Sequence, residues 1–410
     1  MGKVLGIIAE YNPFHNGHLY HLEQAKKLTG SNYTVAVISG NFTQRGSTSL
    51  VDKWARTEMA LNCGIDLVIE LPTLYATSSA ENFADGAIKI LNSLKVVDYL
   101  AFGSETADMD ILNPIADILY QEPKAYKLLL SHELKKGVSF PKARENALML
   151  YLGDIRKYLN VLSEPNNVLG LEYMKSLKKH KSNIIPVAIP RFEAGYNDIN
   201  YSGNIASATA IRNIIKNGDF RIAKKLLPDS SYDILINNIK QGHIVPDLSV
   251  FERQIFYNLR KMNLSEIAEL PDVSEGLENS IKKAANSCNT VSEFLSLVKS
   301  KRYTTTRIQR ILLYALLGIT KKDMLLSKKV LPYIRVLGLN NRGKFLISEI
   351  AKANPKLEII TSVKRFMDTS INKNLKIILE KDVWATNVYS LGYDFDSCSN
   401  LDYTKKIITL

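Results

Sequence analysis

Short apolar runs that alternate with helical patterns over the first ~220 residues constrain the fold of this chain most. Each run is continuous and has the length of a buried strand. Strands separated by helices form mostly parallel sheets, because the helix returns the chain to the starting edge. We therefore predict an α/β fold with a Rossmann-like parallel sheet. The predicted strands are Lys3–Ala9, Tyr33–Ser39, Asp66–Glu70, Tyr99–Phe102 and Ile184–Ile189, and the predicted helices include Trp54–Cys63, Ala80–Leu91 and Asn167–Leu177.

Polar loops follow four of these predicted strands. In open α/β sheets, ligands bind in the crevice outside the carboxyl ends of the strands, where such loops meet. We therefore expect the four loops to form one site. They are Asn12–His18, Ser39–Arg45, Gly103–Glu105 and Arg191–Phe192.

The first of these loops contains the tetrad His15-Asn16-Gly17-His18 at the predicted start of a helix, and His21 follows one turn later. Pro13 predicts a rigid turn before the tetrad, and Gly17 allows close approach of the backbone to a ligand. The free N–H groups and positive dipole end of a helix N-terminus bind phosphate. Two imidazoles add donors for the charge that develops on a leaving pyrophosphate. A chance match with ordinary surface histidines is the alternative.

A second candidate phosphate site is the segment Ile205–Arg212, which reads IASATAIR. Ser207, Thr209 and Arg212 stand at the start of a helical pattern, where hydroxyl and guanidinium groups bind phosphate oxygens. Plain helix capping by the hydroxyls is an equal alternative. Two such sites in one α/β domain suit a nucleoside triphosphate.

The composition changes near Phe220, where lysine becomes frequent and the patterns become mainly helical. We predict helices over Asp272–Val298 and Thr305–Leu317, and possible strands at Leu375–Leu379 and Val388–Leu391. The chain is long enough for two or three domains. We divide it into a nucleotide-binding domain over residues 1–220 and a mostly α-helical basic region over residues 221–410.

Positive charge is concentrated in that second region. The formal net charge is +12, and residues 300–350 hold eleven Lys or Arg against two acidic residues. A solvated helical face is one interpretation; a surface that contacts a nucleic-acid backbone is favoured, because the excess has nearly a single sign. The candidate contacts are Lys301, Arg302, Arg307, Arg310, Lys328, Lys329, Arg335, Arg342 and Lys344.

Cysteine content and hydropathy bear on the cellular compartment. The three cysteines lie far apart, which excludes a disulfide framework and a cysteine-rich zinc site and fits a reducing cytosol. No apolar run reaches the roughly 18 residues that cross a membrane. The first predicted strand starts at Lys3, so we expect no signal peptide. We expect a cytoplasmic protein with no membrane association.

These motifs together resemble the bacterial tRNA(Met) cytidine acetate ligase family, within the HxGH nucleotidylyltransferase superfamily. The resemblance covers essentially the whole chain. One departure is Ala208, which stands where the superfamily's Ile-Ser-Ser-Thr-x-Ile-Arg motif has a second serine. One hydroxyl contact to phosphate is therefore missing or supplied elsewhere. The matching segments are Tyr11–His18, Ser39–Gly46, Phe102–Glu105, Pro165–Tyr173, Arg191–Phe192 and Ser207–Arg212.

The resemblance implies a ligase reaction in two steps. Acetate attacks the α-phosphate of ATP, giving acetyl-adenylate and pyrophosphate. The exocyclic amine of the wobble cytidine in elongator tRNA(Met) then takes the acetyl group, giving N4-acetylcytidine and AMP. We expect Mg²⁺ to arrive on the triphosphate rather than in a protein metal site. We expect no obligate protein partner.

The resemblance also assigns residues. His15 and His18 would stabilise charge on pyrophosphate, and Thr209 and Arg212 would hold the β- and γ-phosphates. The backbone from Ile7 to Tyr20 would wrap ATP, with further contacts from Gly103, Asn166, Arg191 and Ser207. The other members of the wrapping segment are Ile8, Ala9, Glu10, Tyr11, Asn12, Pro13, Phe14, Asn16, Gly17 and Leu19.

The cytidine would leave the anticodon loop to enter the site, and the basic residues at 301–344 would hold the tRNA backbone. Tyr303 and Tyr333 could stack on bases, although core packing is the stronger interpretation. A tight turn, a helix cap and a surface charge are the structural alternatives for Gly103, Asn166 and Arg191.

Two other functions fit part of the pattern. A small-molecule adenylyltransferase would transfer AMP to a phosphorylated cofactor precursor, but it would not need the basic second half. A non-catalytic RNA-binding protein with a vestigial nucleotide fold would have no reason to retain both histidines and Arg212.

Overall fold

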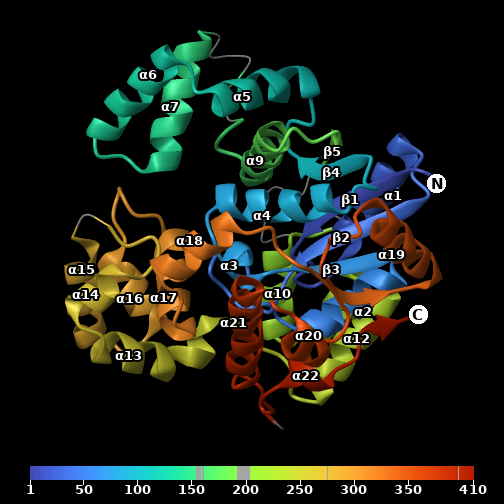
Figure 1. Cartoon of the computed structure of the whole chain (residues 1–410). Helices are drawn as coiled ribbons and strands as arrows, with labels where there is room; N and C mark the ends of the chain where they lie inside the picture. Colours follow the sequence, from blue (N-terminus) through green and yellow to red (C-terminus); the bar gives the residue numbers. More distant parts are fainter. Residues whose placement is uncertain (154–157, 159–160, 192–203, 275, 396) are drawn as a thin grey trace.

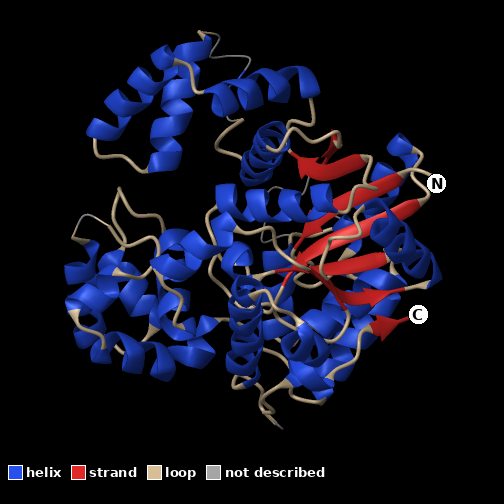
Figure 2. Ribbon diagram, in the orientation of Figure 1, coloured by secondary structure: helices blue, strands red, loops and turns tan. Residues whose placement is uncertain are grey.

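The predicted parallel sheet lies at the centre of the computed structural model, with helices on both faces (Figures 1 and 2). The structure describes residues 1–153, 158, 161–191, 204–274, 276–395 and 397–410. Five strands pair in parallel in the order β5-β4-β1-β2-β3, which confirms the predicted fold class. These strands are β1 (Val4–Ala9), β2 (Tyr33–Ser39), β3 (Leu67–Leu71), β4 (Tyr99–Ser104) and β5 (Ile185–Pro190).

Three further strands come from the second half of the chain. Strand β6 (Ile334–Leu339) pairs antiparallel with β3, and β7 (Ile359–Ile360) and β8 (Ile408–Thr409) pair in parallel with β6. The sheet therefore draws strands from both sides of residue 220. The domain boundary that we place there stays a prediction.

Alternate residues of the central strands face two separate apolar cores. Val35 and Val37 of β2 pack with α4 (Ala80–Ser93), α9 (Pro165–Lys179) and other helices on one face. Ala36 and Ile38 of the same strand pack on the other face. The helices there include α1 (Asn16–Thr29), α2 (Lys53–Asn62) and α10 (Ala208–Lys216). Both faces are buried, which explains why the strand sequences are continuously apolar.

A third apolar core joins helices of the second half, drawn in yellow, orange and red in Figure 1. The helices not named so far are α3 (Thr73–Ala76), α5 (Met109–Gln121), α6 (Lys124–Lys135), α7 (Phe140–Leu152), α11 (Phe220–Leu226), α12 (Asp229–Lys240), η1 (Leu248–Phe251), α13 (Glu252–Lys261), α14 (Leu264–Ala268), α15 (Leu277–Ser287), α16 (Val291–Val298), α17 (Thr305–Leu317), α18 (Lys321–Lys329), α19 (Asn341–Ala353), α20 (Val363–Thr369), α21 (Lys373–Ser390) and α22 (Leu401–Thr404). None of the helices in the described part of the chain combines the length and apolar character needed to cross a bilayer.

The strands that we expect at Leu375–Leu379 and Val388–Leu391 are wrong. Both segments belong to the single helix α21, apart from its cap residue Leu391. Its buried residues recur at spacings of three and four, as in Leu375, Ile378 and Leu379. Short apolar runs of this kind do not distinguish a buried helix from a strand.

Four buried charged residues join the sheet to the end of the chain. Lys53 Nζ lies 2.8 Å from Glu70 Oε1 and 2.7 Å from Asp402 Oδ1. Arg335 Nη1 lies 3.0 Å from Glu70 Oε2, and its Nη2 donates to Asp402. Burial alone would raise the pKa of Asp402, but Arg335 and Lys53 lower it to about 2. The Lys53–Glu70–Arg335–Asp402 cluster therefore links α2, β3, β6 and α22.

Candidate functional site

One cavity of about 300 Å³ lies at the carboxyl ends of β1, β4 and β5, where the sequence predicts a site. The structure brings most of the predicted residues to its lining. The predicted residues that line it are Ile7, Ile8, Ala9, Glu10, Tyr11, Asn12, His15, Gly17, His18, Tyr20, Gly103, Asn166, Arg191, Ser207, Thr209 and Arg212. Each of the four predicted loops contributes at least one residue, although Phe192 lies outside the described residues.

The two imidazoles of the tetrad cap helix α1. His15 Nδ1 accepts a hydrogen bond from the Gly17 N–H at 3.1 Å, and His18 Nδ1 accepts one from the His15 N–H at 3.2 Å. A nitrogen that accepts from an N–H carries no proton, so the neutral ring holds its proton on Nε2. Both Nε2–H groups therefore remain as donors. The rings stack with centroids 3.7 Å apart.

Burial and neighbouring cations keep these rings neutral. Burial, followed by the charges of Arg191 and Arg212, lowers the pKa of His15 to about 3. Burial and neighbouring imidazoles lower the pKa of His18 well below its usual value. Burial and Arg191 lower that of His21 to about 4, against a hydrogen bond to the Phe102 backbone that raises it. The site thus offers neutral donors near pH 7.

Glycine at position 17 is a steric requirement of this arrangement. A Cβ there would lie 2.9 Å from His15 Cε1 and 3.0 Å from its Nδ1. Any side chain would push the ring away from the N–H that fixes its protonation. The Gly of the tetrad therefore positions the first histidine.

Four members of the predicted wrapping segment do not line the cavity. Phe14 is fully buried in the core, Pro13 follows a cis peptide bond, and Leu19 packs against the same core. Asn16 Nδ2 donates to the carbonyls of Asn204 and Lys225. Phe14, Asn16 and Leu19 therefore contact the rest of the protein and do not line the cavity.

The second motif faces the first across the cavity. Ser207 accepts from the Ala210 N–H at 3.2 Å, so its hydroxyl caps α10 while also lining the cavity. Arg212 donates to Thr209 Oγ1 at 3.0 Å and to the Asn12 carbonyl at 2.9 Å. Two helix N-termini therefore converge on one cavity, an arrangement that favours binding of a polyphosphate.

The motifs at Phe102–Glu105 and Pro165–Tyr173 are joined by side-chain hydrogen bonds. Asn166 Nδ2 donates to Glu105 Oε1 at 2.5 Å, and Asn167 Oδ1 accepts from Ser104 Oγ at 2.6 Å. Their side of the cavity also includes Gly103 and Arg191. These contacts fix the amino end of α9 against the carboxyl end of β4.

Twelve further described residues line the cavity without having been assigned a ligand contact from the sequence. Most are apolar residues at strand and helix ends, where the sequence alone does not separate lining from core. Gln44 and Arg45 belong to the polar loop after β2, and their place in that loop was the sequence feature that could have indicated a ligand contact. The full set is His21, Gln44, Arg45, Phe83, Phe102, Leu169, Tyr173, Ile189, Pro190, Ile205, Ala206 and Ala208.

Comparison with known proteins decides the family. The profile described as HIGH nucleotidyl transferase matches residues 2–404. The tRNA(Met) cytidine acetate ligase of Caldanaerobacter subterraneus subsp. tengcongensis is 48% identical over 409 residues, covering 100% of both chains. That of Acetivibrio thermocellus is 44% identical over 95% of each chain. This chain belongs to the tRNA(Met) cytidine acetate ligase family.

Solved structures of the family share the whole fold. The apo form of Thermotoga maritima TmcAL matches with a TM-score of 0.95 and 37% identity, over 100% of this chain and 99% of that one. The same protein bound with alpha-thio ATP matches with a TM-score of 0.92 and 36% identity, at the same coverage. A structure of that relative therefore holds an ATP analogue.

Within this family fold, the nine basic candidates do not form one surface. Arg335 belongs to the buried cluster and cannot reach a phosphate, which corrects its assignment. Arg310 is buried and pairs with Asp272 at 2.7 Å, and Arg307 donates to the Asp272 carbonyl at 2.8 Å. The exposed candidates are Lys301, Arg302, Lys328, Lys329, Arg342 and Lys344.

The exposed candidates also divide by position. Arg342 and Lys344 begin α19, directly after β6. The last residue of β6, Leu339, pairs with the first residue of β3. These two basic residues therefore lie near the amino ends of the parallel strands, whereas the cavity lies at their carboxyl ends.

The two tyrosines that could stack on bases pack inside the protein instead. Tyr333 is fully buried and donates to Asp382. Tyr303 packs against the third core, with Arg307 4.9 Å from its ring centroid. Core packing is therefore the role that the structure gives them.

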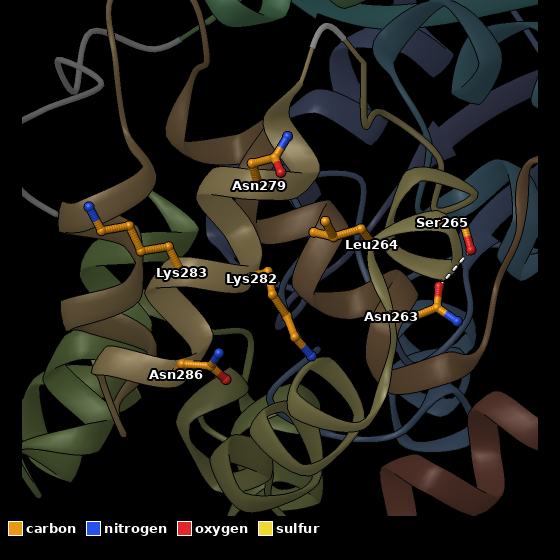
Figure 3. Close-up of a pocket in the computed structure, with 7 residues that line it drawn as sticks. All are labelled: Asn263, Leu264, Ser265, Asn279, Lys282, Lys283 and Asn286. Carbon is orange, nitrogen blue, oxygen red and sulfur yellow. Dashed lines mark hydrogen bonds between the residues drawn. The ribbon is translucent and has the colours of Figure 1, made fainter.

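A second hollow, of about 780 Å³, lies between α14 and α15 on the helical second half (Figure 3). Its central lysine, Lys282, donates to the carbonyls of Leu259, Arg260 and Met262, and so caps the end of α13. Lys283 and Asn286, of the same helix as Lys282, also line the hollow. Neither this hollow nor any other described part of the chain gathers three metal-ligating side chains.

Proposed function

We propose that this protein activates acetate with ATP and transfers the acetyl group to N4 of the wobble cytidine of elongator tRNA(Met). The observation that carries the proposal is the convergence of two helix N-termini, one with a histidine pair and one with Thr209 and Arg212, on one cavity. The family relatives of full length support the same reaction.

In the first step, an acetate oxygen attacks the α-phosphorus of ATP, and the bond to the bridging oxygen of pyrophosphate breaks. Negative charge grows on the pyrophosphate. His15 and His18 donate their Nε2–H groups to it, and Arg212 and Thr209 hold the outer phosphates. Because the imidazoles are fixed by backbone N–H groups, they need no reorientation as the charge develops. The protein contributes positioning and charge stabilisation.

We place Mg²⁺ on the triphosphate, because magnesium commonly binds enzymes through substrate phosphates and water. The tRNA contacts exposed basic residues of the second half, Lys328 and Lys329 among them, through its phosphates. The reaction takes place in the cytoplasm, where the three free cysteines stay reduced. It requires no partner protein.

The test measures exchange of labelled pyrophosphate into ATP. We expect exchange that depends on acetate and falls at least about 100-fold in His15→Ala and His18→Ala, since each removes a preorganised donor. The exposed His132 supplies a matched control, so His132→Ala should retain exchange. Mass spectrometry of tRNA nucleosides from cells that lack the gene should show loss of N4-acetylcytidine.

Two results would favour other functions. Exchange that ignores acetate but needs a phosphorylated precursor would indicate a small-molecule adenylyltransferase. Tight tRNA binding without any exchange would indicate an RNA-binding protein without catalysis.

A further inference from the structure

Glu10 is an unexpected residue in this cavity. It follows β1 directly, and it is the sole carboxylate among the described lining residues. The substrates of the first step, ATP and acetate, are both anions, so a carboxylate there weakens their binding by repulsion. Its side chain therefore suits a different substrate, one that donates hydrogen bonds.

One carboxylate oxygen of Glu10 is held by the protein. Oε1 accepts from the Gln44 N–H at 2.8 Å, and Gln44 Nε2 in turn donates to the Ser78 carbonyl at 3.1 Å. The Glu10 carbonyl accepts from Arg56 Nη1 at 2.6 Å. Among the described residues, no hydrogen bond is found to Oε2. Within the described part of the chain, Oε1 is thus held by the protein and Oε2 is left for a further donor.

Aromatic side chains line the same cavity as this carboxylate. Burial, followed by the charge of Glu10, raises the pKa of Tyr173. Tyr173 meets Phe102 edge to face, with ring centroids 6.3 Å apart, and Phe83 also lines the cavity. Enzymes that act on a nucleobase hold it between aromatic or apolar side chains and hydrogen-bond its Watson–Crick edge. A glutamate is a standard acceptor for the N4 amino group of cytosine.

We propose that Glu10 is a catalytic residue of the acetyl-transfer step: its carboxylate accepts the N4–H of the acceptor cytosine and removes that proton. This inference rests on the proposed function. N4 forms a bond to the acetyl carbonyl carbon, and the bond from that carbon to the AMP oxygen breaks, with AMP taking the electron pair. The N4 proton passes to Glu10 Oε2 and then to water.

Glu10→Gln tests the assignment, because it keeps the shape and the Oε1 acceptor but removes the base. We expect acetyl transfer to tRNA to fall about 100-fold more than acetate-dependent pyrophosphate exchange, in keeping with general-base catalysis. Acetyl-adenylate should accumulate in the variant, and the KM for tRNA should change less than about threefold. The matched control is Glu81→Gln, a solvent-exposed position on α4, which should keep both rates within about twofold.

Several results would overturn the inference. Equal losses of exchange and transfer would place the carboxylate in the adenylation step, for instance on a magnesium ion. Unchanged transfer would exclude a catalytic role. If Glu10→Gln does not fold, Glu10→Asp provides the test. Its shorter carboxylate should lower the rate of acetyl transfer about tenfold relative to the rate of pyrophosphate exchange. If the ratio of the two rates is unchanged, Glu10 is not the base. Absence of exchange in the unaltered protein would instead refute the proposed function.

Discussion

The chemistry of each tetrad imidazole is decided by a backbone N–H. Gly17 and His15 supply these donors from the first turn of α1. The capping positions of a helix normally attract Ser, Thr, Asp or Asn. Histidine at this position does two things together, because one ring nitrogen satisfies the helix end while the other faces the ligand.

The buried imidazoles should make the protein sensitive to acid. The pKa is lowered to about 3 for His15 and to about 4 for His21, whereas an unfolded histidine titrates near 6.5. Between these values the unfolded state binds more protons, so the contribution to stability is complete above about pH 6.5 and decreases as pH falls. Each imidazole contributes a slope of up to about 1.4 kcal/mol per pH unit.

Urea denaturation of wild type and His21→Phe between pH 7.5 and 5 measures this effect. The variant lacks one titrating group, so its free energy of unfolding should decrease less steeply with falling pH. Equal slopes for the two proteins would contradict the burial of the neutral ring.

Arg335 should prove a stabilising residue rather than an RNA contact. Arg335→Ala leaves Glu70 and Asp402 with Lys53 as their remaining partner in the cluster. We expect a loss of about 3–5 kcal/mol in the free energy of unfolding, because it leaves a buried carboxylate without full compensation. Lys301→Ala, at an exposed position, should change the free energy of unfolding by less than about 0.5 kcal/mol. If Arg335→Ala barely changes the free energy of unfolding but weakens tRNA binding, Arg335 contacts RNA after all.

At the scale of elements, the sequence predicts the first five strands well. β2 matches its predicted bounds, and the other four differ by one or two residues at their ends. The inner strands are buried on both faces between helices, so local composition and the requirement of the fold agree. The motif loops after β1, β2, β4 and β5 were predictable for the same reason.

The sequence does not predict β6 to β8. The partner of β6, strand β3, lies far away in the chain, and β7 and β8 are two residues long. A segment so short takes its conformation from the neighbour it pairs with rather than from its own residues. The mistaken strands within α21 have a related cause: four or five apolar residues suit either element until the packing partner is known.

Gly46 connects the β2 loop to α17 and can be tested by substitution. Its φ is 73°, and a Cβ there would lie 2.4 Å from the backbone N of Arg310. Gly318 has a φ of 63° and nothing within 4 Å, so it supplies the matched control. Gly46→Ala should destabilise the protein by more than the roughly 1 kcal/mol expected for Gly318→Ala, and should also displace Gln44 and Arg45 from the cavity.

Thermal denaturation and the apparent KM for ATP and acetate measure these two effects. If both variants lose the same stability, the loop after β2 moves to accommodate the added methyl group. Contact with α17 would then not determine the position of that loop.

For the whole molecule, the exposed basic residues are not all placed alike: Arg342 and Lys344 follow β6 at the amino ends of the parallel strands, away from the cavity. We expect Lys328→Ala with Lys329→Ala to weaken tRNA binding and to reduce the salt slope of log K by roughly 1 to 2, as two phosphate contacts are lost. Arg342→Ala with Lys344→Ala should change the slope less. Filter binding at several salt concentrations measures both. A larger effect from the second pair would place the tRNA on the other side of the protein.

The cluster of Lys53, Glu70, Arg335 and Asp402 has a consequence for how the chain is made. During synthesis, Lys53 and Glu70 leave the ribosome early, whereas their partners Arg335 and Asp402 follow much later. Contacts between such distant segments form slowly, because the chain must close a long loop first. Until the last partner arrives, folding the sheet would bury mismatched charge. Truncated products of interrupted translation should therefore remain unfolded and open to proteases, so that only chains that carry Asp402 become stable protein.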